Sequence, residues 1–88
     1  MTEVVMYTTR FCPYCVRAKQ LLQNKHVGFT EIRIDEQPEL RPEMEQRARR
    51  TSVPQIFIDD FHVGGCDDLY ALEHKGELDN KLGIKSHA

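Results

Sequence analysis

The chain has 88 residues, of which 40% are hydrophobic and 30% charged, so it can form one modest core and is predicted to be a single domain over residues 1–88. Its net charge of −2, with no aromatic residues interleaved on a basic face, argues against nucleic-acid binding. The first residues lack a basic region and a long apolar stretch, so we expect neither a signal peptide nor a membrane span. Three cysteines are too few for a secreted disulfide scaffold, and the expected compartment is the cytoplasm.

The first predicted elements are a strand and a helix. The run from Val4 to Tyr7 is apolar and rich in β-branched residues, which is typical of a central strand covered on both faces. A helix is predicted to begin at Pro13, because proline suits the first helical position and Cys12 can cap it. We expect this helix to stop before Gly28. Its inward face carries Cys15, Ala18, Leu21 and Leu22.

The spacing of Cys12 and Cys15 suits reversible disulfide chemistry. In the first turn of a helix their Cα atoms would lie about 5 Å apart, inside the window of roughly 4.4 to 6.8 Å that a disulfide requires. The amides of Tyr14 and Cys15 and the positive end of the helix dipole would stabilise a thiolate at Cys12 and lower its pKa from about 8.5 toward or below neutrality. We therefore predict that Cys12 is the nucleophile and that Cys15, one turn deeper, is a resolving thiol.

Two structural roles compete with this redox interpretation of the CxxC pair. A zinc site would need a second tight pair of ligands, and only His62 and Cys66 are close enough in sequence to form half of one. A purely structural disulfide closing so short a loop would remove little entropy from the unfolded chain. We therefore expect no metal site, and redox chemistry is the favoured interpretation.

The middle of the chain predicts a strand and a second helix. Residues 29–35 alternate between more and less polar side chains, which favours an edge strand. Pro38 predicts a loose turn, and Pro42 predicts a regular helix to about residue 50. The arginines near the end of this helix either cap it or contribute to binding an anionic substrate. They are Arg47, Arg49 and Arg50.

A β-hairpin and a last helix follow. The hairpin is predicted from two β-rich runs, residues 55–58 and 61–63, around the turn formers Asp59-Asp60. Gly64-Gly65 ends its second strand. The next helix is expected to open at Asp67-Asp68.

The C-terminal part completes the predicted topology. Gly76 is the expected stop of the last helix, a final turn docks through Leu78 and Leu82, and the tail over about residues 84–88 is expected to be mobile. The order β-α-β-α-β-β-α puts the CxxC pair at the carboxyl end of the first strand. In sheets with parallel crossovers, ligands bind at that end.

Three motifs together resemble the dithiol glutaredoxins, and most of all the short bacterial ones. They are Cys12-Pro13-Tyr14-Cys15 in a βαβ unit, Thr51-Ser52-Val53-Pro54-Gln55 before the hairpin and Gly64-Gly65-Cys66-Asp67-Asp68 after it. The resemblance spans nearly the whole chain, and three motifs in this order and spacing are highly specific. It implies the α/β class and a thioredoxin fold, with a four-stranded mixed sheet flanked by three or more helices and a glutathione groove beside Cys12.

The resemblance also implies a set of site residues. Those implied for glutathione are Arg10, Tyr14, Val53, Pro54, Gly65, Cys66 and Asp67. The Val53–Pro54 bond would be cis, and the backbone of Val53 would pair with the cysteinyl unit of glutathione like an added strand. The γ-glutamyl end would lie at Cys66 and Asp67, although Asp67 has helix capping as an alternative role. Gly65 would permit close backbone approach. Cys66 is either a small buried residue or a third redox thiol.

This chain departs from the family pattern at two positions. Glutaredoxins usually have a lysine three residues before the nucleophile, where this chain has Thr9 followed by Arg10. That lysine helps to stabilise the thiolate and to bind the glycine carboxylate of glutathione. We hypothesise that Arg10 or the arginines near residue 49 take over part of this work. The second departure is His26, where relatives often have the glycine that ends the first helix, and we expect Gly28 to end it here.

The function implied by the resemblance is that of a glutathione-dependent thiol–disulfide oxidoreductase. It would be a monomer with no bound cofactor, using glutathione as reductant and co-substrate to reduce glutathionylated and disulfide-bonded proteins. One alternative is a thioredoxin-like dithiol reductant, but that family's site resembles Trp-Cys-Gly-Pro-Cys and this chain has no tryptophan. Another is a module in which Cys12 and glutathione hold an iron–sulfur cluster between two copies. Pro13 and Cys15 argue against it, because such relatives typically have a single active-site cysteine followed by glycine.

Overall fold

The computed structural model describes residues 2–84 of the chain. Four strands form one sheet in the order β2-β1-β3-β4. Their bounds are Val4–Thr8 for β1, Thr30–Arg33 for β2, Gln55–Ile58 for β3 and Phe61–Gly64 for β4. β1 pairs parallel with β2 and antiparallel with β3, and β3 pairs antiparallel with β4. The sheet is therefore mixed, as predicted, with β1 inside it and β2 at an edge.

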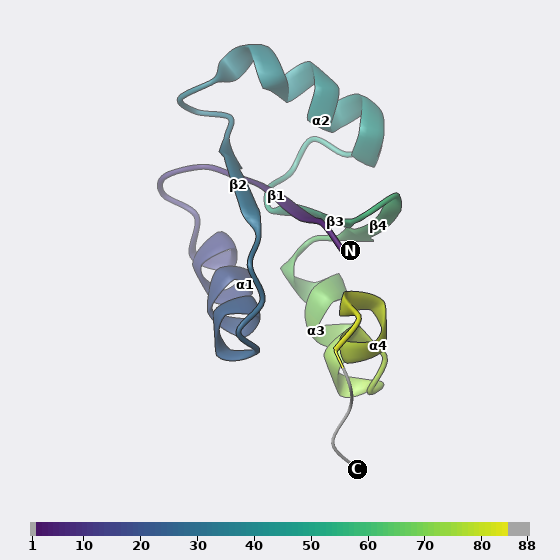
Figure 1. The fold of residues 1–88 in the computed structure, drawn as a ribbon. Helices are drawn as coiled ribbons and strands as arrows, with labels where there is room; N and C mark the ends of the chain where they lie inside the picture. Colours follow the sequence, from purple (N-terminus) through teal and green to yellow (C-terminus); the bar gives the residue numbers. More distant parts are fainter. Residues whose placement is uncertain (1, 85–88) are drawn as a thin grey trace.

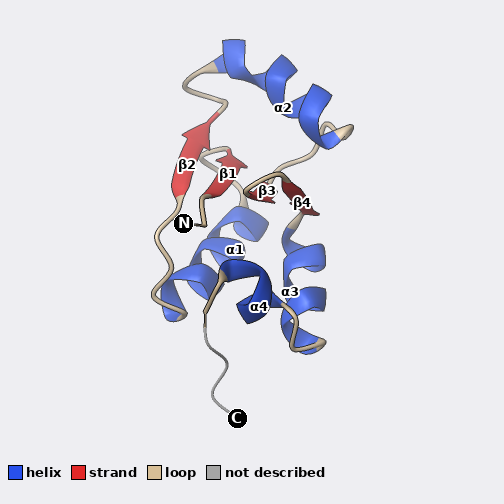
Figure 2. Ribbon diagram, turned by 45° about the vertical axis from the view of Figure 1, so that its right-hand side comes forward, coloured by secondary structure: helices blue, strands red, loops and turns tan. Residues whose placement is uncertain are grey.

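Helices cover both faces of this sheet (Figures 1 and 2). One face carries α1 (Pro13–Asn24), α3 (Cys66–His74) and α4 (Leu78–Leu82). The other face carries α2 (Arg41–Ala48), which follows a short 3-10 turn, η1 (Pro38–Leu40). Within residues 2–84, none of these helices has both the length and the apolar character needed to cross a lipid bilayer.

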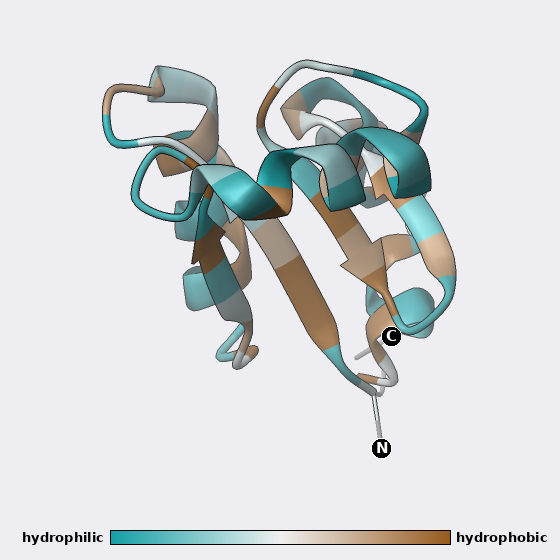
Figure 3. Cartoon of the chain, turned by 90° about the horizontal axis from the view of Figure 1, so that it is seen from above, coloured by the Kyte–Doolittle hydropathy of each residue, from teal (hydrophilic) through white to brown (hydrophobic). Residues whose placement is uncertain are grey.

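Two apolar clusters fill the spaces between the sheet and its helices. Side chains alternate along β1, so Val4 and Met6 face α1, α3 and α4, whereas Tyr7 faces α2. The larger cluster comprises Val4, Met6, Ala18, Leu22, Ile56, Ile58, Val63, Cys66, Leu69, Leu78 and Leu82. The smaller one comprises Tyr7, Ile34, Met44, Ala48 and Phe57. Figure 3 shows strands that are largely hydrophobic beneath a largely hydrophilic α2.

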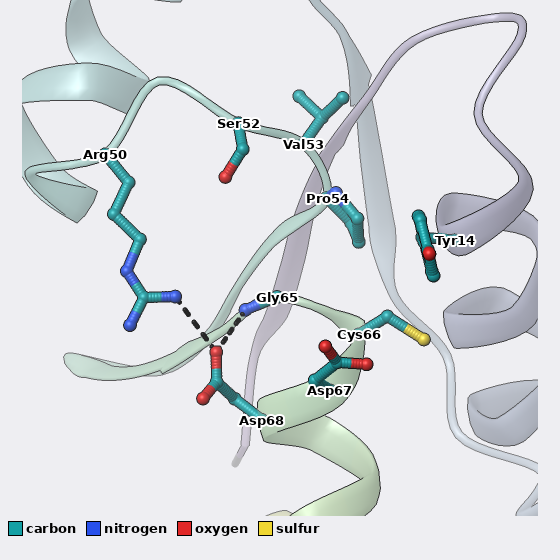
Figure 4. A pocket seen from close by; sticks show the side chains of 9 residues that line it. All are labelled: Tyr14, Arg50, Ser52, Val53, Pro54, Gly65, Cys66, Asp67 and Asp68. Atoms are coloured by element: carbon teal, nitrogen blue, oxygen red, sulfur yellow. Dashed lines mark hydrogen bonds and ion pairs between the residues drawn. The ribbon is translucent and has the colours of Figure 1, made fainter.

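The second helix is shorter than the sequence predicts. The expected end is near Arg50, but α2 ends at Ala48 because Arg49 adopts a left-handed φ of 58°. The Arg49 N–H still donates to the Glu45 carbonyl at 2.8 Å and closes the last turn. The chain then leaves the helix with the Arg50 side chain directed toward Asp68 at the start of α3 (Figure 4).

The hairpin and the C-terminal helices lie close to their predicted positions. Asp59-Asp60 joins β3 to β4, and Asp59 takes a left-handed φ of 52°. α3 begins one residue earlier than expected, at Cys66, and ends before Gly76, whose φ is 72°. Most of the tail predicted from about residue 84 lies outside the described residues. Ile84 itself donates its N–H to a carbonyl of α4 at 2.9 Å.

The end of α1 corrects one expectation. Gly28 is the expected stop, but the chain turns earlier, at His26, which has a left-handed φ of 58°. The His26 N–H donates to the Gln23 carbonyl at 3.0 Å and the Val27 N–H donates to the Leu22 carbonyl at 3.1 Å, which is a Schellman arrangement. Side chains with a Cβ are disfavoured in this conformation, so His26 occupies a position that suits glycine.

Replacing His26 with glycine is therefore expected to stabilise the fold by about 0.5–1 kcal/mol, because glycine adopts the left-handed conformation without a steric penalty. The histidine side chain is exposed, so little packing is lost. Asn24→Gly, in the last turn of α1, is the matched control and should destabilise by about 0.5–1 kcal/mol. Urea unfolding measures both variants, and a His26→Gly variant no more stable than the wild type would contradict the prediction.

Candidate active site

Cys12 and Cys15 lie at the start of α1, as the sequence predicts. Cys12 is the N-cap residue with extended backbone (φ −137°, ψ 97°), and Pro13 is the first residue of the helix. A disulfide joins the two cysteines, whose Cα atoms are 5.1 Å apart. The Cys15 N–H donates to the Cys12 sulfur at 3.1 Å, whereas the Tyr14 N–H, which was also expected to do so, makes no such bond. The first turn of α1 thus supplies one amide to the sulfur of Cys12.

The two sulfur-bearing residues differ in accessibility. Cys12 is 8% exposed and Cys15 is 1% exposed. Cys12 is therefore the more accessible of the two cysteines. In the reduced protein the Cys15 amide and the positive end of α1 favour the thiolate of Cys12 over its thiol.

A pocket of about 250 Å³ is bordered by Tyr14, the residue that precedes Cys15 (Figure 4). Three segments far apart in the sequence line it, namely the start of α1, the loop before β3 and the start of α3. The lining residues are Tyr14, Arg50, Ser52, Val53, Pro54, Gly65, Cys66, Asp67 and Asp68. The pocket thus brings together all the residues that the resemblance implies for glutathione except Arg10. The Val53–Pro54 bond is cis, as the resemblance also implies.

Val53 lines the pocket and has backbone groups that are free to bind a ligand. Within residues 2–84, its N–H donates to no acceptor. Its carbonyl oxygen lies 3.9 Å from the Cys12 sulfur, which is part of a disulfide and has no hydrogen to donate. An extended ligand can therefore pair with this residue as an added strand does.

Arg50 and Asp68 form an ion pair at one end of the pocket (Figure 4). The Arg50 guanidinium lies 2.9 Å from Asp68 Oδ2, which also accepts the Gly65 N–H at 2.9 Å. The Gly65 hydrogen bond and the Arg50 guanidinium lower the pKa of Asp68, so this carboxylate is ionised at neutral pH. Asp68 therefore holds the start of α3, which is the capping role considered for Asp67. Asp67 is exposed and forms no ion pair with another described residue.

The two glycines before α3 have different roles. Gly64 has a φ of 111°, and a Cβ built on it would overlap the carboxylate of Asp68. A Cβ on Gly65 would lie 3.5 Å from the Pro54 carbonyl oxygen, which is an ordinary van der Waals contact. Gly64 is therefore required by its backbone conformation and by the position of Asp68. The close approach of glutathione to Gly65 stays a prediction.

Arg10 lies outside the pocket. Its N–H donates to Asp35 Oδ2 at 3.0 Å, and its guanidinium carbon lies 5.1 Å from the ring centre of Phe11. Arg33 also binds Asp35, through hydrogen bonds of 2.8 and 2.6 Å, and lowers the pKa of Asp35 to about 2. The Arg10 backbone therefore anchors the loop before Cys12. Of the two hypotheses for replacing the family lysine, this geometry favours an arginine near residue 49.

Cys66 is a free cysteine at the first position of α3 and is only 5% exposed. Burial raises the pKa of its thiol, which disfavours the reactive thiolate. These observations favour the small buried residue over the third redox thiol. Among residues 2–84, no three His, Cys, Asp or Glu side chains gather closely enough to hold a metal ion.

A comparison of the chain with known protein families agrees with the fold and the site described here. The glutaredoxin family model matches residues 4–63 of this chain. The chain belongs to the glutaredoxin family. A glutaredoxin from Pseudomonas aeruginosa is 62% identical over 82 residues, which is 93% of this chain and 98% of the relative.

Solved glutaredoxin structures share the fold. The solution structure of glutaredoxin from Brucella melitensis is 53% identical, with a TM-score of 0.80 over 98% of this chain and 96% of that one. The crystal structure of a buckwheat glutaredoxin–glutathione complex is 26% identical, with a TM-score of 0.85 over 93% of this chain and 77% of that one. The chain therefore has the thioredoxin fold of glutaredoxins. It is a glutathione-dependent thiol–disulfide oxidoreductase.

Some residues of the pocket were not identified from the sequence. The sequence motifs contain Ser52 and Asp68 but do not indicate that these residues bind a ligand. Arg50 is one of three candidate arginines near the end of the second predicted helix. Asp68 carried a usable signal, because an acidic residue at the third position of a helix is a capping pattern. The position of Arg50 depends on where α2 ends, and this in turn depends on the conformation of Arg49.

Proposed function

We propose that Cys12 is the nucleophile of this glutaredoxin and that Cys15 is its resolving thiol. The observation that carries the proposal is the environment of the Cys12 sulfur, which is 3.1 Å from the Cys15 amide and 3.9 Å from the Val53 carbonyl oxygen. The sulfur therefore has both a group that favours the thiolate and a neighbouring backbone that can hold a peptide. The lower exposure of Cys15 supports its role in the second step.

Glutathione is proposed to lie along the pocket with its cysteinyl unit against the backbone of Val53. The N–H of Val53 supports this pose, because it donates to no acceptor within residues 2–84. The γ-glutamyl end is assigned to the start of α3, where Asp67 can pair with its ammonium group and the amides near Cys66 with its carboxylate. Gly65 and Tyr14 border the same pocket.

The first reaction is the removal of glutathione from a glutathionylated protein. The Cys12 thiolate attacks the glutathione sulfur of the mixed disulfide, so a Cys12–glutathione disulfide forms as the bond to the protein sulfur breaks. The protein leaves as a thiolate and takes a proton from solvent. A second glutathione, as its thiolate, then attacks the glutathione sulfur on Cys12. This step releases glutathione disulfide and regenerates the Cys12 thiolate.

Protein disulfides follow the dithiol route. Cys12 attacks one sulfur of the protein disulfide and forms a mixed disulfide, which Cys15 resolves by attacking the Cys12 sulfur. The products are the reduced protein and the Cys12–Cys15 disulfide, which two glutathione molecules then reduce. The family potential of about −200 to −230 mV makes such proteins weaker reductants than thioredoxin, at about −270 mV.

The direct test of this function is the reduction of a glutathione mixed disulfide coupled to glutathione reductase and NADPH. We expect turnover that depends on glutathione. A wild-type protein that reduces this substrate only with thioredoxin reductase as electron source would overturn the proposed route.

The proposal also extends to the setting in which the protein works. We assign it to the cytoplasm, because a pair at the family potential is kept largely reduced by a cytosolic glutathione poise of about −220 to −260 mV. We further propose that it acts as a monomer and as one domain over residues 1–88, with no resident cofactor.

Arg50 is assigned to the glycine carboxylate of glutathione, in place of the family lysine. It lines the pocket and is about half exposed, so its guanidinium can reach a ligand while still close to Asp68. We expect Arg50→Ala to raise the KM for a glutathionylated peptide about five- to tenfold, the loss of one charge-assisted hydrogen bond. Arg10→Ala is the matched control, since its guanidinium lies on Phe11. A larger KM increase for Arg10→Ala than for Arg50→Ala would reverse the assignment.

A further inference from the structure

One fully buried polar side chain is bonded to the pocket residue Ser52 without lining the pocket itself. Gln55, the first residue of β3, is completely shielded from solvent, although its three neighbours in that strand are apolar. Its amide nitrogen donates to the Ser52 carbonyl oxygen at 3.0 Å and lies 3.3 Å from Ser52 Oγ. Its amide oxygen lies 2.7 Å from His62 Nε2. The side chain therefore connects β3, the loop before it and β4.

The hydrogen-bonding roles along this chain of groups follow from chemistry. A peptide carbonyl can only accept, so the Gln55 nitrogen must face Ser52 and the Gln55 oxygen must face His62. His62 Nε2 must then carry a hydrogen and donate it. The ring is held in place because it stacks on Phe57, with ring centres 4.8 Å apart and planes inclined by 26°. The direction of every bond from His62 to Ser52 is thereby fixed.

The Ser52 carbonyl belongs to the same peptide unit as the Val53 N–H. A trans peptide unit is planar, with its C=O and N–H pointing in opposite directions. Holding the Ser52 oxygen toward Gln55 therefore turns the Val53 N–H away from Gln55. Among the described residues, that N–H has no acceptor.

We propose that Gln55 and His62 are positioning residues for glutathione binding, which act by fixing the orientation of the Ser52–Val53 peptide. The inference rests on the proposed pairing of glutathione with the Val53 backbone. Neither side chain lines the pocket or touches the Cys12 sulfur in the structure. Their effect is therefore on the affinity for the glutathionyl group and not on the chemistry at Cys12.

The need for this geometry explains why a polar side chain is buried at the start of β3. An apolar residue would fill the same space without removing an amide from water, so burial alone does not favour glutamine. A buried amide whose donors and acceptor are all used instead restricts the groups that it connects. Here it restricts a loop that otherwise has few backbone hydrogen bonds between α2 and β3.

The test compares variants of His62, which is only partly buried and lies on an edge strand. His62→Phe keeps a ring against Phe57 but removes the donor, and His62→Gln restores an N–H at a similar reach. Gln55→Leu removes the central amide, and Gln46→Leu, on the exposed face of α2, is the control for that change. KM and kcat are measured for a glutathionylated peptide, together with the pKa of the Cys12 thiol from the pH dependence of its alkylation.

We expect His62→Phe and Gln55→Leu to raise KM about three- to tenfold, the effect of losing one orienting hydrogen bond, with kcat and the Cys12 pKa nearly unchanged. His62→Gln and Gln46→Leu should resemble the wild type. An unchanged KM in His62→Phe, or an equal increase in His62→Gln, would overturn the inference. If Gln55→Leu fails to fold, the two His62 variants decide the question alone. Failure of the proposed function would appear separately, as a wild type that does not act on the glutathionylated peptide.

Discussion

Replacing Cys12 with serine is expected to lower the reduction of a glutathionylated peptide by about 1000-fold or more, because a serine hydroxyl is neutral at pH 7 and forms no mixed disulfide. The residue lies at the N-terminus of α1 with the Cys15 amide 3.1 Å from its sulfur, an arrangement that supports a thiolate. Turnover coupled to glutathione reductase and NADPH measures the loss. Cys66→Ser is the control. Burial raises the pKa of the Cys66 thiol, and the contact proposed for glutathione at this position uses backbone amides, which serine keeps. The activity of this variant should therefore stay within about twofold of wild type.

The Cys15→Ser variant separates the two reactions of the enzyme. Removal of glutathione needs only Cys12 and a second glutathione, so its rate should remain within about threefold of wild type. Reduction of a protein disulfide should fail after the first step, leaving a mixed disulfide with Cys12 that can be trapped and identified by mass. Equal loss of both reactions in Cys15→Ser would show that the second thiol is required for the main activity. Full activity of Cys12→Ser would remove Cys12 as the nucleophile.

Gly64→Ala is expected to destabilise the fold by about 2–4 kcal/mol. Two effects add. A left-handed φ costs a residue with a Cβ about 1–3 kcal/mol. Displacing the Asp68 carboxylate also removes a helix cap that contributes about 0.5–2 kcal/mol. The φ of Gly64 is 111°, and its Cβ would overlap that carboxylate. For a domain of this size the change corresponds to a fall in Tm of roughly 10–25 °C. Thermal and urea unfolding measure it.

Gly28→Ala is the matched control for this prediction. A Cβ at Gly28 would have no heavy atom within 4 Å, and its φ is not left-handed. Its stability should therefore stay within about 0.5 kcal/mol of wild type. If Gly64→Ala unfolds at the same urea concentration as Gly28→Ala, then neither backbone strain nor displacement of Asp68 destabilises the fold, and the prediction is wrong.

The elements that could be predicted from the sequence are those with strong local signals. Pro13 after a capping Cys12 defines the start of α1, and the Cα separation of 5.1 Å between the cysteines agrees with helical spacing. The apolar run that begins at Val4 marks an inner strand because both of its faces are covered. The Asp59-Asp60 pair marks the hairpin turn. In each case the residues that carry the signal are adjacent to the element that they define.

The misplaced helix ends depend on residues that adopt unfavoured backbone conformations. His26 and Arg49 both end helices in the left-handed conformation, which residues with a Cβ disfavour. The sequence therefore predicts each helix end about two residues too late. Arg50 reaches the pocket because Arg49 turns the chain and Asp68, eighteen residues away, holds the guanidinium. Arg10, which is closer to the nucleophile in sequence, lies against Phe11 instead. For the two arginines, proximity in sequence to Cys12 is therefore a poor guide to whether the residue lines the pocket.

The contact between the Cys15 amide and the Cys12 sulfur spans only three residues, whereas the pocket beside it is assembled from three segments spread over more than fifty positions. Reactivity and selectivity of this enzyme therefore have different origins. The contact that favours the thiolate lies within one helical turn. The pocket that we assign to glutathione exists only while the sheet holds its three segments together. A substitution that disturbs the sheet but leaves the first turn of α1 unchanged is therefore expected to weaken the binding of glutathione more than it changes the pKa of Cys12.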